Sequence, residues 1–432
     1  MFRTFSTVVI SAALVLIAAS SASASQYKVI YTFQSTSGAY DLQTQMIADA
    51  AGNLYGVSQF GGANGLGAVF ELSPNSKGIW TENILHSFSG GDGDEPLAAL
   101  IMDKNGNLYG TTLAGGASSC ESPDNICGTV YQLSPNGDGT WTETVLVDFI
   151  GDNGLSPDGS LVFDGAGNLY GTTTLGGANG WGTVFELSPN GDGTWTENVL
   201  HSFGLDANGS EPDSNLLLDT QGNLWGTTAV GGILQDCPRS DGCGTIFEMT
   251  PQLGGGWLEK VVLTFNGKNG IGPMGLTFDP SGNVFGYTTN GGVGTCSEYR
   301  GNGCGEIFEL VASTGYTPRM IVQFANEPVA VPVGIVFDFL GNLYGTSLGG
   351  GHPTCGSPQL FCGTIFKGTP NLSSGYTFNV LYDFPGQTSN GFKPGAPLTI
   401  DSAGNIYGST AFGGNPNCGI NGGCGVVFQI TP

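Results

Sequence analysis

The chain has 432 residues, of which 75 are glycine, roughly two and a half times the usual share of about 7%. Because 39% of the residues are hydrophobic and only 11% are charged, the chain can build a core, which excludes disorder as its main state. The glycines have no three-residue period, which excludes collagen. A formal net charge of −24 with only 11 Lys and Arg residues excludes an electrostatic nucleic-acid binder.

The first 24 residues have the pattern of a signal peptide. Arg3 precedes an apolar run over residues 8–19, and Ala22-Ser23-Ala24 is typical of a signal peptidase site. No cysteine follows that site to carry a lipid, and no second stretch has the roughly 20 apolar residues of a membrane span. We therefore expect a leader over 1–24 and one mature domain over 25–432. We expect that domain to be monomeric and secreted or periplasmic, with no membrane insertion and no C-terminal anchor.

One unit recurs seven times along the mature chain. Its mark is the pentapeptide Gly-Asn-(Leu/Val/Ile)-(Tyr/Trp/Phe)-Gly, which begins at Gly52, Gly106, Gly167, Gly222, Gly282, Gly341 and Gly404. An aspartate stands three residues ahead of each copy, and a Gly-Gly pair follows it. Consecutive copies begin 54 to 63 residues apart. Repeats of this length are typical of propeller blades and are too long for the coils of a parallel β-helix.

Each unit reads as four short strands, labelled a to d in chain order. In the second unit these are residues 97–103, 107–113, 128–133 and 141–149, separated by turn residues. No segment has the 3.6-residue period of an amphipathic helix. The sequence therefore predicts an all-β fold, a seven-bladed β-propeller of four-stranded antiparallel blades.

The two ends of the chain complete one blade between them. Residues 27–33 resemble strand d, whereas residues 425–430 form a strand c with no strand d after it. Because a propeller must cover the edges where its first and last blades meet, we expect the N-terminal strand to close the ring in a 1+3 arrangement.

Ten cysteines fall into five close pairs. In an exported chain an even number of cysteines favours disulfides, and these spacings are looser than those of zinc sites. We predict five bonds, each within one b–c loop: Cys120–Cys127, Cys237–Cys243, Cys296–Cys304, Cys355–Cys362 and Cys418–Cys424. We predict no metal site formed by cysteines.

The repeat resembles a known family. Gly-Asn-Leu-Tyr-Gly-Thr-Thr, Gly-Gly and Gly-Thr-Val-Phe-Glu-Leu-Ser-Pro, as in residues 167–189, are similar to the GloVer-type tandem repeat of exported bacterial "choice-of-anchor" proteins. The resemblance covers essentially the whole mature chain and implies no established reaction. A looser similarity, through the Asp-x-x-Gly-Asn-Leu-Tyr turn, is to NHL-type and SMP-30-like propellers.

Residues that recur in every unit are best explained by structure. The Asp and Asn of the a–b turn are predicted to cap that turn, and the mid-strand glycines such as Gly110 mark bulges or close packing. The spacing of Asn136, Asp138 and Thr140 resembles that of calcium-loop ligands, but a hairpin turn explains it better. We predict no cofactor, although calcium is an open possibility.

No catalytic residue emerges from the sequence. His86 and His201 occupy a strand-d position that varies between units, so we expect them to face solvent, and His352 has no nucleophile near it in sequence. No Ser stands in a Gly-x-Ser-x-Gly elbow. Paired carboxylates of a glycosidase remain open because carboxylates are plentiful.

The d–a loops of the first half of the ring are rich in acidic residues. They hold Asp92, Asp94, Glu95, Asp152, Asp158, Asp206, Glu211 and Asp213. Variable loops on a rigid scaffold are where binding usually resides, although acidic loops also keep an exported protein soluble. We therefore expect a non-catalytic propeller that binds a glycan or protein ligand at these residues. The alternative is a glycosidase, a lyase or an SMP-30-like metal-dependent hydrolase working in the central channel.

Overall fold

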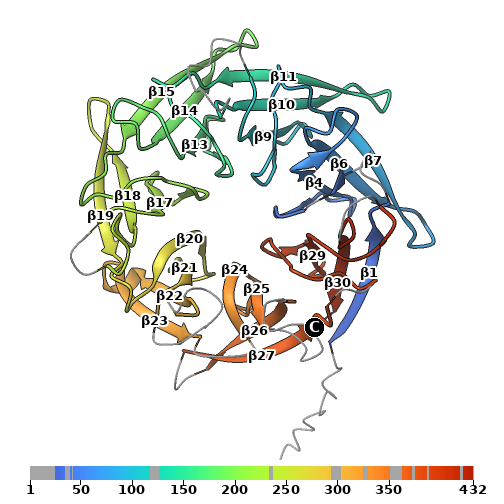
Figure 1. The fold of residues 1–432 in the computed structure, drawn as a ribbon. Coiled ribbons are helices and arrows are strands. Elements are labelled where there is room, and N and C mark those ends of the chain that lie inside the picture. Colours follow the sequence, from blue (N-terminus) through green and yellow to red (C-terminus); the bar gives the residue numbers. More distant parts are fainter. Residues whose placement is uncertain are drawn as a thin grey trace, which may run out of the picture.

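Seven four-stranded antiparallel sheets surround a central axis as the blades of a propeller (Figure 1). This computed structural model describes residues 25–34, 39–40, 42–116, 126–232, 237–292, 303–324, 329–350, 362–371, 375–386, 389–418 and 422–431. The predicted seven-bladed β-propeller is confirmed. The predicted leader, His352 and three of the ten cysteines lie outside the described residues.

Each blade runs outward from the axis through strands a, b, c and d. Strands a are β3 (Ile47–Ala48), β8 (Ile101–Met102), β12 (Val162–Phe163), β16 (Leu217–Leu218), β20 (Ile271–Phe278), β24 (Val329–Phe337) and β28 (Thr399–Ile400). Strands b are β4 (Leu54–Ser58), β9 (Leu108–Thr112), β13 (Leu169–Thr173), β17 (Leu224–Thr228), β21 (Val284–Asn290), β25 (Leu343–Gly350) and β29 (Ile406–Thr410).

The outer half of each blade has longer strands. Strands c are β6 (Ala68–Pro74), β10 (Thr129–Pro135), β14 (Thr183–Pro189), β18 (Thr245–Pro251), β22 (Glu306–Val311), β26 (Thr364–Asn371) and β30 (Val426–Thr431). Strands d are β7 (Trp80–Ser87), β11 (Trp141–Asp148), β15 (Trp195–Ser202), β19 (Trp257–Thr264), β23 (Thr317–Gln323), β27 (Gly375–Asp383) and β1 (Gln26–Thr32). A two-stranded ribbon of β2 (Ala39–Tyr40) and β5 (Phe60–Gly61) and the short helix η1 (Ala312–Thr314) complete the described elements. Among the described residues, no helix has the length and apolar character that crossing a membrane requires.

Strand a is shorter than the sequence predicts in five of the seven described blades. The segment predicted as a strand over 97–103 pairs only at Ile101–Met102. Pro96, which has no N–H, and Glu95, which has a positive φ of 54°, precede this segment. The first half of the segment is therefore free of regular pairing and lies against the channel.

The mid-strand glycine of strand b makes room for an aromatic ring from strand c. Gly226 pairs with Phe247, and a Cβ at Gly226 would lie 2.3 Å from the Phe247 ring. The same register joins Gly56 to Phe70. The prediction of close packing is confirmed; a bulge lies opposite the mid-strand glycine in the fifth blade, between Met274 and Thr277, and further bulges lie between strands c and d, as at Val69/Phe70.

The a–b turn is held by its aspartate in every blade. In the third blade Asp164 Oδ1 accepts the N–H groups of Ala166 and Asn168, both at 2.9 Å, and Oδ2 accepts the Asn168 side-chain amide at 2.9 Å. Gly167 has a φ of +93°, which a residue with a Cβ adopts only under strain. The predicted turn-capping role of this aspartate is confirmed.

A joint between adjacent blades recurs at six of the seven junctions in the described residues. The residue before a proline has a positive φ and donates its N–H to the carbonyl just ahead of strand c in the preceding blade, as Ser156 does to Cys127 at 3.1 Å. The proline packs against the glycine that follows this carbonyl in the preceding blade. A Cβ at Gly128 would lie 2.6 Å from Cδ of Pro157. Seven buried hydrophobic clusters lie between neighbouring blades of the described chain.

The N-terminal strand closes the ring. β1 pairs antiparallel with β30, from Gln26 opposite Thr431 to Thr32 opposite Val426, so the last blade has the order β1-β30-β29-β28. Figure 1 shows blue β1 beside dark red β30. Tyr27 stacks on Tyr382 of the preceding blade with ring centroids 3.8 Å apart. The predicted 1+3 closure is confirmed.

Two of the predicted disulfides are confirmed, Cys237–Cys243 and Cys418–Cys424. Cys127, Cys304 and Cys362 are also disulfide-bonded, and their predicted partners Cys120, Cys296 and Cys355 lie outside the described residues. The second cysteine of each pair is buried at the joint between blades. These bonds therefore stiffen the loops from which the joints start.

Replacing the stacked tyrosine of β1 should weaken the closure. Tyr27→Ala removes a ring that contacts Tyr382, Phe384 and Phe428, so we expect it to lower the free energy of unfolding by about 2–4 kcal/mol. Lys28→Ala, on the exposed side of the same strand, should change it by less than about 0.5 kcal/mol. Urea unfolding measures both variants. Equal losses would contradict the closing role of Tyr27.

Removing a turn aspartate should cost stability at neutral pH and less in acid. Asp164→Ala leaves two N–H groups without their acceptor, an expected loss of about 1–2 kcal/mol. Burial opposes ionisation of Asp164, but hydrogen bonds from Asn168 and its neighbours outweigh it and hold its pKa below the ordinary value. Its contribution is therefore present above the unfolded pKa and lost as pH falls through the lower folded pKa. Thermal melts from neutral to acid pH should show the difference in melting temperature between Asp164→Ala and the parent becoming smaller.

Candidate functional site

The two faces of the propeller differ in how their polar side chains are used. The a–b and c–d turns form the turn face, where Asp and Asn side chains bond their own backbone, as Asp138 does to Thr140 N at 2.9 Å. The hairpin prediction for this turn is thereby confirmed. The b–c and d–a loops form the other face, the loop face, around the mouth of the channel. All eight predicted ligand-binding carboxylates belong to segments that begin there.

The structure separates these eight residues into different surroundings. Asp152 and Asp206 are exposed. Four others, Asp92, Asp94, Glu95 and Glu211, are half-buried in the loops. The last two, Asp158 and Asp213, line the central channel. The expected single acidic region on the loop face therefore divides into a rim and a channel pair.

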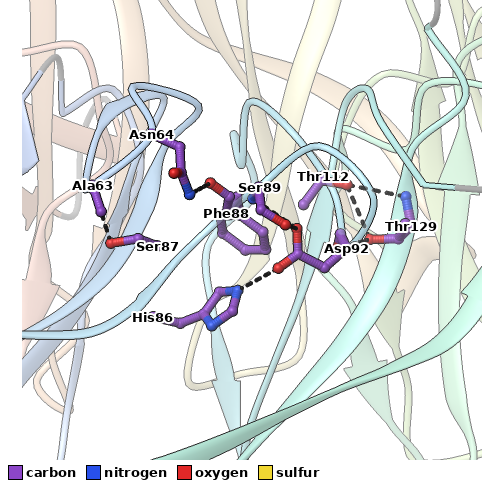
Figure 2. Close-up of polar contacts among 9 residues, drawn as sticks. All are labelled: Ala63, Asn64, His86, Ser87, Phe88, Ser89, Asp92, Thr112 and Thr129. Atoms are coloured by element: carbon purple, nitrogen blue, oxygen red, sulfur yellow. Dashed lines mark hydrogen bonds and ion pairs between the residues drawn. The ribbon is translucent and has the colours of Figure 1, made fainter.

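Asp92 is held by its own loop. Figure 2 shows its carboxylate between His86 and Ser89: it accepts the Ser89 N–H at 2.7 Å and lies 2.9 Å from His86 Nε2. Burial opposes ionisation of Asp92, but these contacts outweigh it and keep its pKa below the ordinary value. The carboxylate stabilises the d–a loop, so its hydrogen-bonding capacity is largely used within the protein.

The two strand-d histidines are half-buried, so the expectation that they face solvent is wrong. The His86 ring packs edge-on against Phe88 and the His201 ring against Phe203, because the blade interface reaches this far outward. Burial lowers the pKa of His201, partly opposed by the charge of Asp206. Both rings therefore belong to the packing between blades.

The rim carboxylates meet other polar groups in the loops. Glu95 accepts a hydrogen bond from Gln59 Nε2 at 3.0 Å, and burial together with the charge of Glu95 raises the pKa of Asp94. Burial and the charge of Asp241 raise the pKa of Glu211, while Arg239 opposes this. Arg239 in turn pairs with Asp241 at 3.0 Å. The rim is acidic, but several of its side chains already interact with other polar or charged groups of the loops.

A cavity of about 430 Å³ lies in the channel and is lined by strand a and the residues before it. Polar side chains come from the first, third and fourth blades: Gln43, Gln45, Asp158, Ser160, Asp213 and Asn215. Apolar residues come from the other blades, among them Leu97, Met274, Ile335 and Pro397. The channel wall therefore carries polar and apolar side chains from different blades.

Most of the polar side chains on the described channel wall form hydrogen bonds with neighbouring blades. Gln45 Nε2 donates to the Leu398 carbonyl at 2.8 Å, Ser160 Oγ accepts the Ala99 N–H at 3.0 Å, and Asn215 Nδ2 donates to the Leu276 carbonyl at 3.3 Å. These bonds tie adjacent inner segments together where regular pairing is short. They leave the two aspartates as the carboxyl groups of the cavity wall.

Asp158 and Asp213 occupy equivalent positions in adjacent blades. Both keep some contact with the channel, yet protein atoms surround them on nearly every side. Burial raises the pKa of Asp158 to about 7, against one hydrogen bond from Thr174 Oγ1 at 3.0 Å. Burial and the charge of Asp158 raise the pKa of Asp213 to about 8. Asp213 Oδ1 is buried with no donor among the described residues.

Sequence reasoning placed these two aspartates in loops and missed the polar residues beside them. Gln43, Asp158 and Asp213 each stand six residues before a turn aspartate. Because the turn fixes the register of every inner segment, that offset is a signal that marks channel-lining positions.

Among the described residues, no three His, Cys, Asp or Glu side chains come together in a way that could hold a metal ion. The two channel aspartates are the carboxylates among the described residues of the cavity wall, beside amide and hydroxyl oxygens such as those of Gln43 and Ser160. The expectation of no cofactor, with calcium as an open possibility, stays a prediction.

Comparison with protein families decides which repeat this is. The model of the Gloeobacter/Verrucomicrobia repeat matches residues 16–121 and 119–294. The chain belongs to this repeat family. The predicted GloVer-type resemblance is confirmed. No curated protein sequence matches the chain.

Solved structures share the fold of this repeat protein. The extracellular domain of the putative hybrid two-component system BT3049 from B. thetaiotaomicron has a TM-score of 0.53 at 14% identity, over 94% of this chain and 41% of its own. PorZ from Porphyromonas gingivalis has a TM-score of 0.50 at 15% identity, over 93% of this chain and 47% of its own. This chain thus spans less than half the length of either protein. A chain of the Mitotic Checkpoint Complex has a TM-score of 0.51 at 11% identity, over 100% of this chain and 98% of its own. Such low identities establish the propeller fold alone.

Neutralising the buried carboxyl should stabilise the protein in alkali. The pKa of Asp213 is raised to about 8, so its protonated form contributes stability that is fully present below the unfolded pKa and lost as pH rises through about 8. Asp213→Asn stays neutral, so its melting temperature relative to the parent should be higher at about pH 9 than at about pH 5. The exposed Asp152→Asn should show a constant difference. A pH-independent difference for Asp213→Asn would contradict the burial of its charge.

Proposed function

We propose that this repeat protein is an exported, non-catalytic binding propeller. Its ligand, a glycan or a protein, contacts the loop face and reaches the channel at Asp158 and Asp213. The disulfides of the b–c loops favour an oxidising compartment, as the predicted leader does. Two proteins of similar fold are described as an extracellular domain and as an essential bacterial surface component, which supports export by analogy.

The observation that carries the proposal is the contrast between the two faces. Turn-face carboxylates such as Asp164 accept several hydrogen bonds each. On the channel wall Asp213 Oδ1 has no donor, although the cavity beside it measures about 430 Å³. Buried polar groups are nearly always satisfied in native proteins, and binding sites are a common exception. The unmet acceptor beside the cavity supports the proposal that the ligand reaches the channel at Asp213.

The same pair favours one catalytic alternative. A carboxyl with a pKa of about 7 or 8 can hold a proton at neutral pH, as a general acid of a glycosidase must. A lyase or a metal-dependent hydrolase in the channel would use the same channel-lining residues. Turnover of fluorogenic glycosides or uronates that is lost in Asp158→Asn would establish the enzyme. Binding to the same sugars without turnover would establish the binding protein.

Removing both channel carboxyls should abolish ligand binding without unfolding the ring. We expect the double variant Asp158→Asn/Asp213→Asn to bind its glycan at least about tenfold more weakly, because each hydrogen bond to a charged group contributes about 1.5–3 kcal/mol. A glycan array with the labelled protein, followed by titration of the retained sugars, measures the change. Asp138→Asn, on the turn face, is the matched control and should bind as the parent does. Unchanged affinity in the double variant would move the site away from the channel.

A further inference from the structure

Among the described residues, Asp213 has no positively charged partner on the channel wall. The carboxylates of Asp158 and Glu211 add negative charge near it, and Arg239, which opposes them, is paired with Asp241. A buried carboxylate without a counter-charge is strongly unfavourable, so the group must either hold a proton or meet a cation supplied from outside.

Apolar side chains line the cavity on both sides of the two aspartates. Leu97, Met274 and Ile335 contribute side chains from three other blades, and Tyr287 borders the cavity while its hydroxyl donates to the Val333 carbonyl at 2.9 Å. A ligand that occupies the whole space must therefore join a polar head to a hydrocarbon stem. A bare ion would leave the space beside the apolar side chains unfilled.

The charge of the whole chain selects the sign of the head group. At a formal net charge of −24, with an acidic rim around the channel mouth, the protein attracts cations and repels anions. A hard divalent cation prefers six or more oxygen ligands, whereas an ammonium group is satisfied by three acceptors. Two carboxyls whose amide and hydroxyl neighbours already bond adjacent blades suit the ammonium better.

We propose that Asp158 and Asp213 bind a primary ammonium group carried on a short aliphatic stem, with the stem against Leu97, Met274 and Ile335. The inference rests on the proposed function, because it assigns the ligand class of the same channel site. A free alkylamine and the lysine side chain of a polypeptide both carry this chemistry.

Binding of an ammonium group should release a proton. The raised pKa of both carboxyls means that the empty pair holds a proton near neutral pH, and a bound cation favours the charged form. The groups that also act on this pair are Glu211, Arg239 and Tyr287; of these, Glu211 adds negative charge and Arg239 opposes it. Proton release is thus a readout that packing of the stem alone would not produce.

The test compares n-pentylammonium with 1-pentanol by titration calorimetry at neutral pH in two buffers of different ionisation enthalpy. We expect n-pentylammonium to bind with an enthalpy that depends on the buffer, and 1-pentanol to bind at least about tenfold more weakly. Asp213→Asn should weaken n-pentylammonium about tenfold or more and abolish the buffer dependence, while Asp138→Asn should match the parent. Equal binding of amine and alcohol, no amine binding, or an unaffected Asp213→Asn would each overturn the inference.

A second arm separates the sources of the ammonium group. Nα-acetyl-lysine N-methylamide that binds more tightly than n-pentylammonium supports a polypeptide lysine, and the reverse order supports a free amine. The proposed function fails on a different result. If glycan binding still depends on the channel carboxyls while neither amine binds, the ammonium inference alone is wrong.

Discussion

The joint between blades is the constraint on which the rest of this propeller depends. At each described example, one residue with a positive φ donates its N–H backward to the preceding blade, and the proline after it packs on a glycine there. Glu95, Ser156, Glu211, Val331 and Lys393 all adopt φ values between 54° and 56°, which is costly for residues with a Cβ. The cost is accepted because this backbone position sets both the spacing and the tilt of adjacent blades.

The joint also creates the channel wall. Because the chain turns sharply at the proline, the next few residues leave the sheet and face the axis before strand a begins. Asp158 follows Pro157 directly, and Asp213 follows Pro212. Their carboxyls therefore reach the cavity through the same backbone geometry that holds the ring together. The short segment that begins at the proline therefore forms part of the joint and, in the third and fourth blades, part of the candidate site.

The two faces of the ring then take different roles. On the turn face each turn aspartate accepts hydrogen bonds from its own turn. Seven similar turns therefore make a uniform surface whose carboxylates are already used within the protein. On the loop face the b–c loops differ in length and cysteine content, and the channel beneath them carries polar and apolar side chains from different blades. The differences between blades, rather than the repeat itself, therefore give the loop face its distinct chemistry.

The sequence by itself determined the number of blades, their four strands, the capped turns and the closure by residues 27–33. These features follow from local backbone preferences and from a period that recurs seven times, so no distant contact is needed to infer them. Only the tertiary structure decided that Asp158 and Asp213 leave the rim for the channel, that Asp92 is held by His86, and that the strand-d histidines are half-buried. Those outcomes depend on the tilt of each blade and on which residues some 50 positions apart are brought together, and a one-dimensional pattern does not contain that geometry.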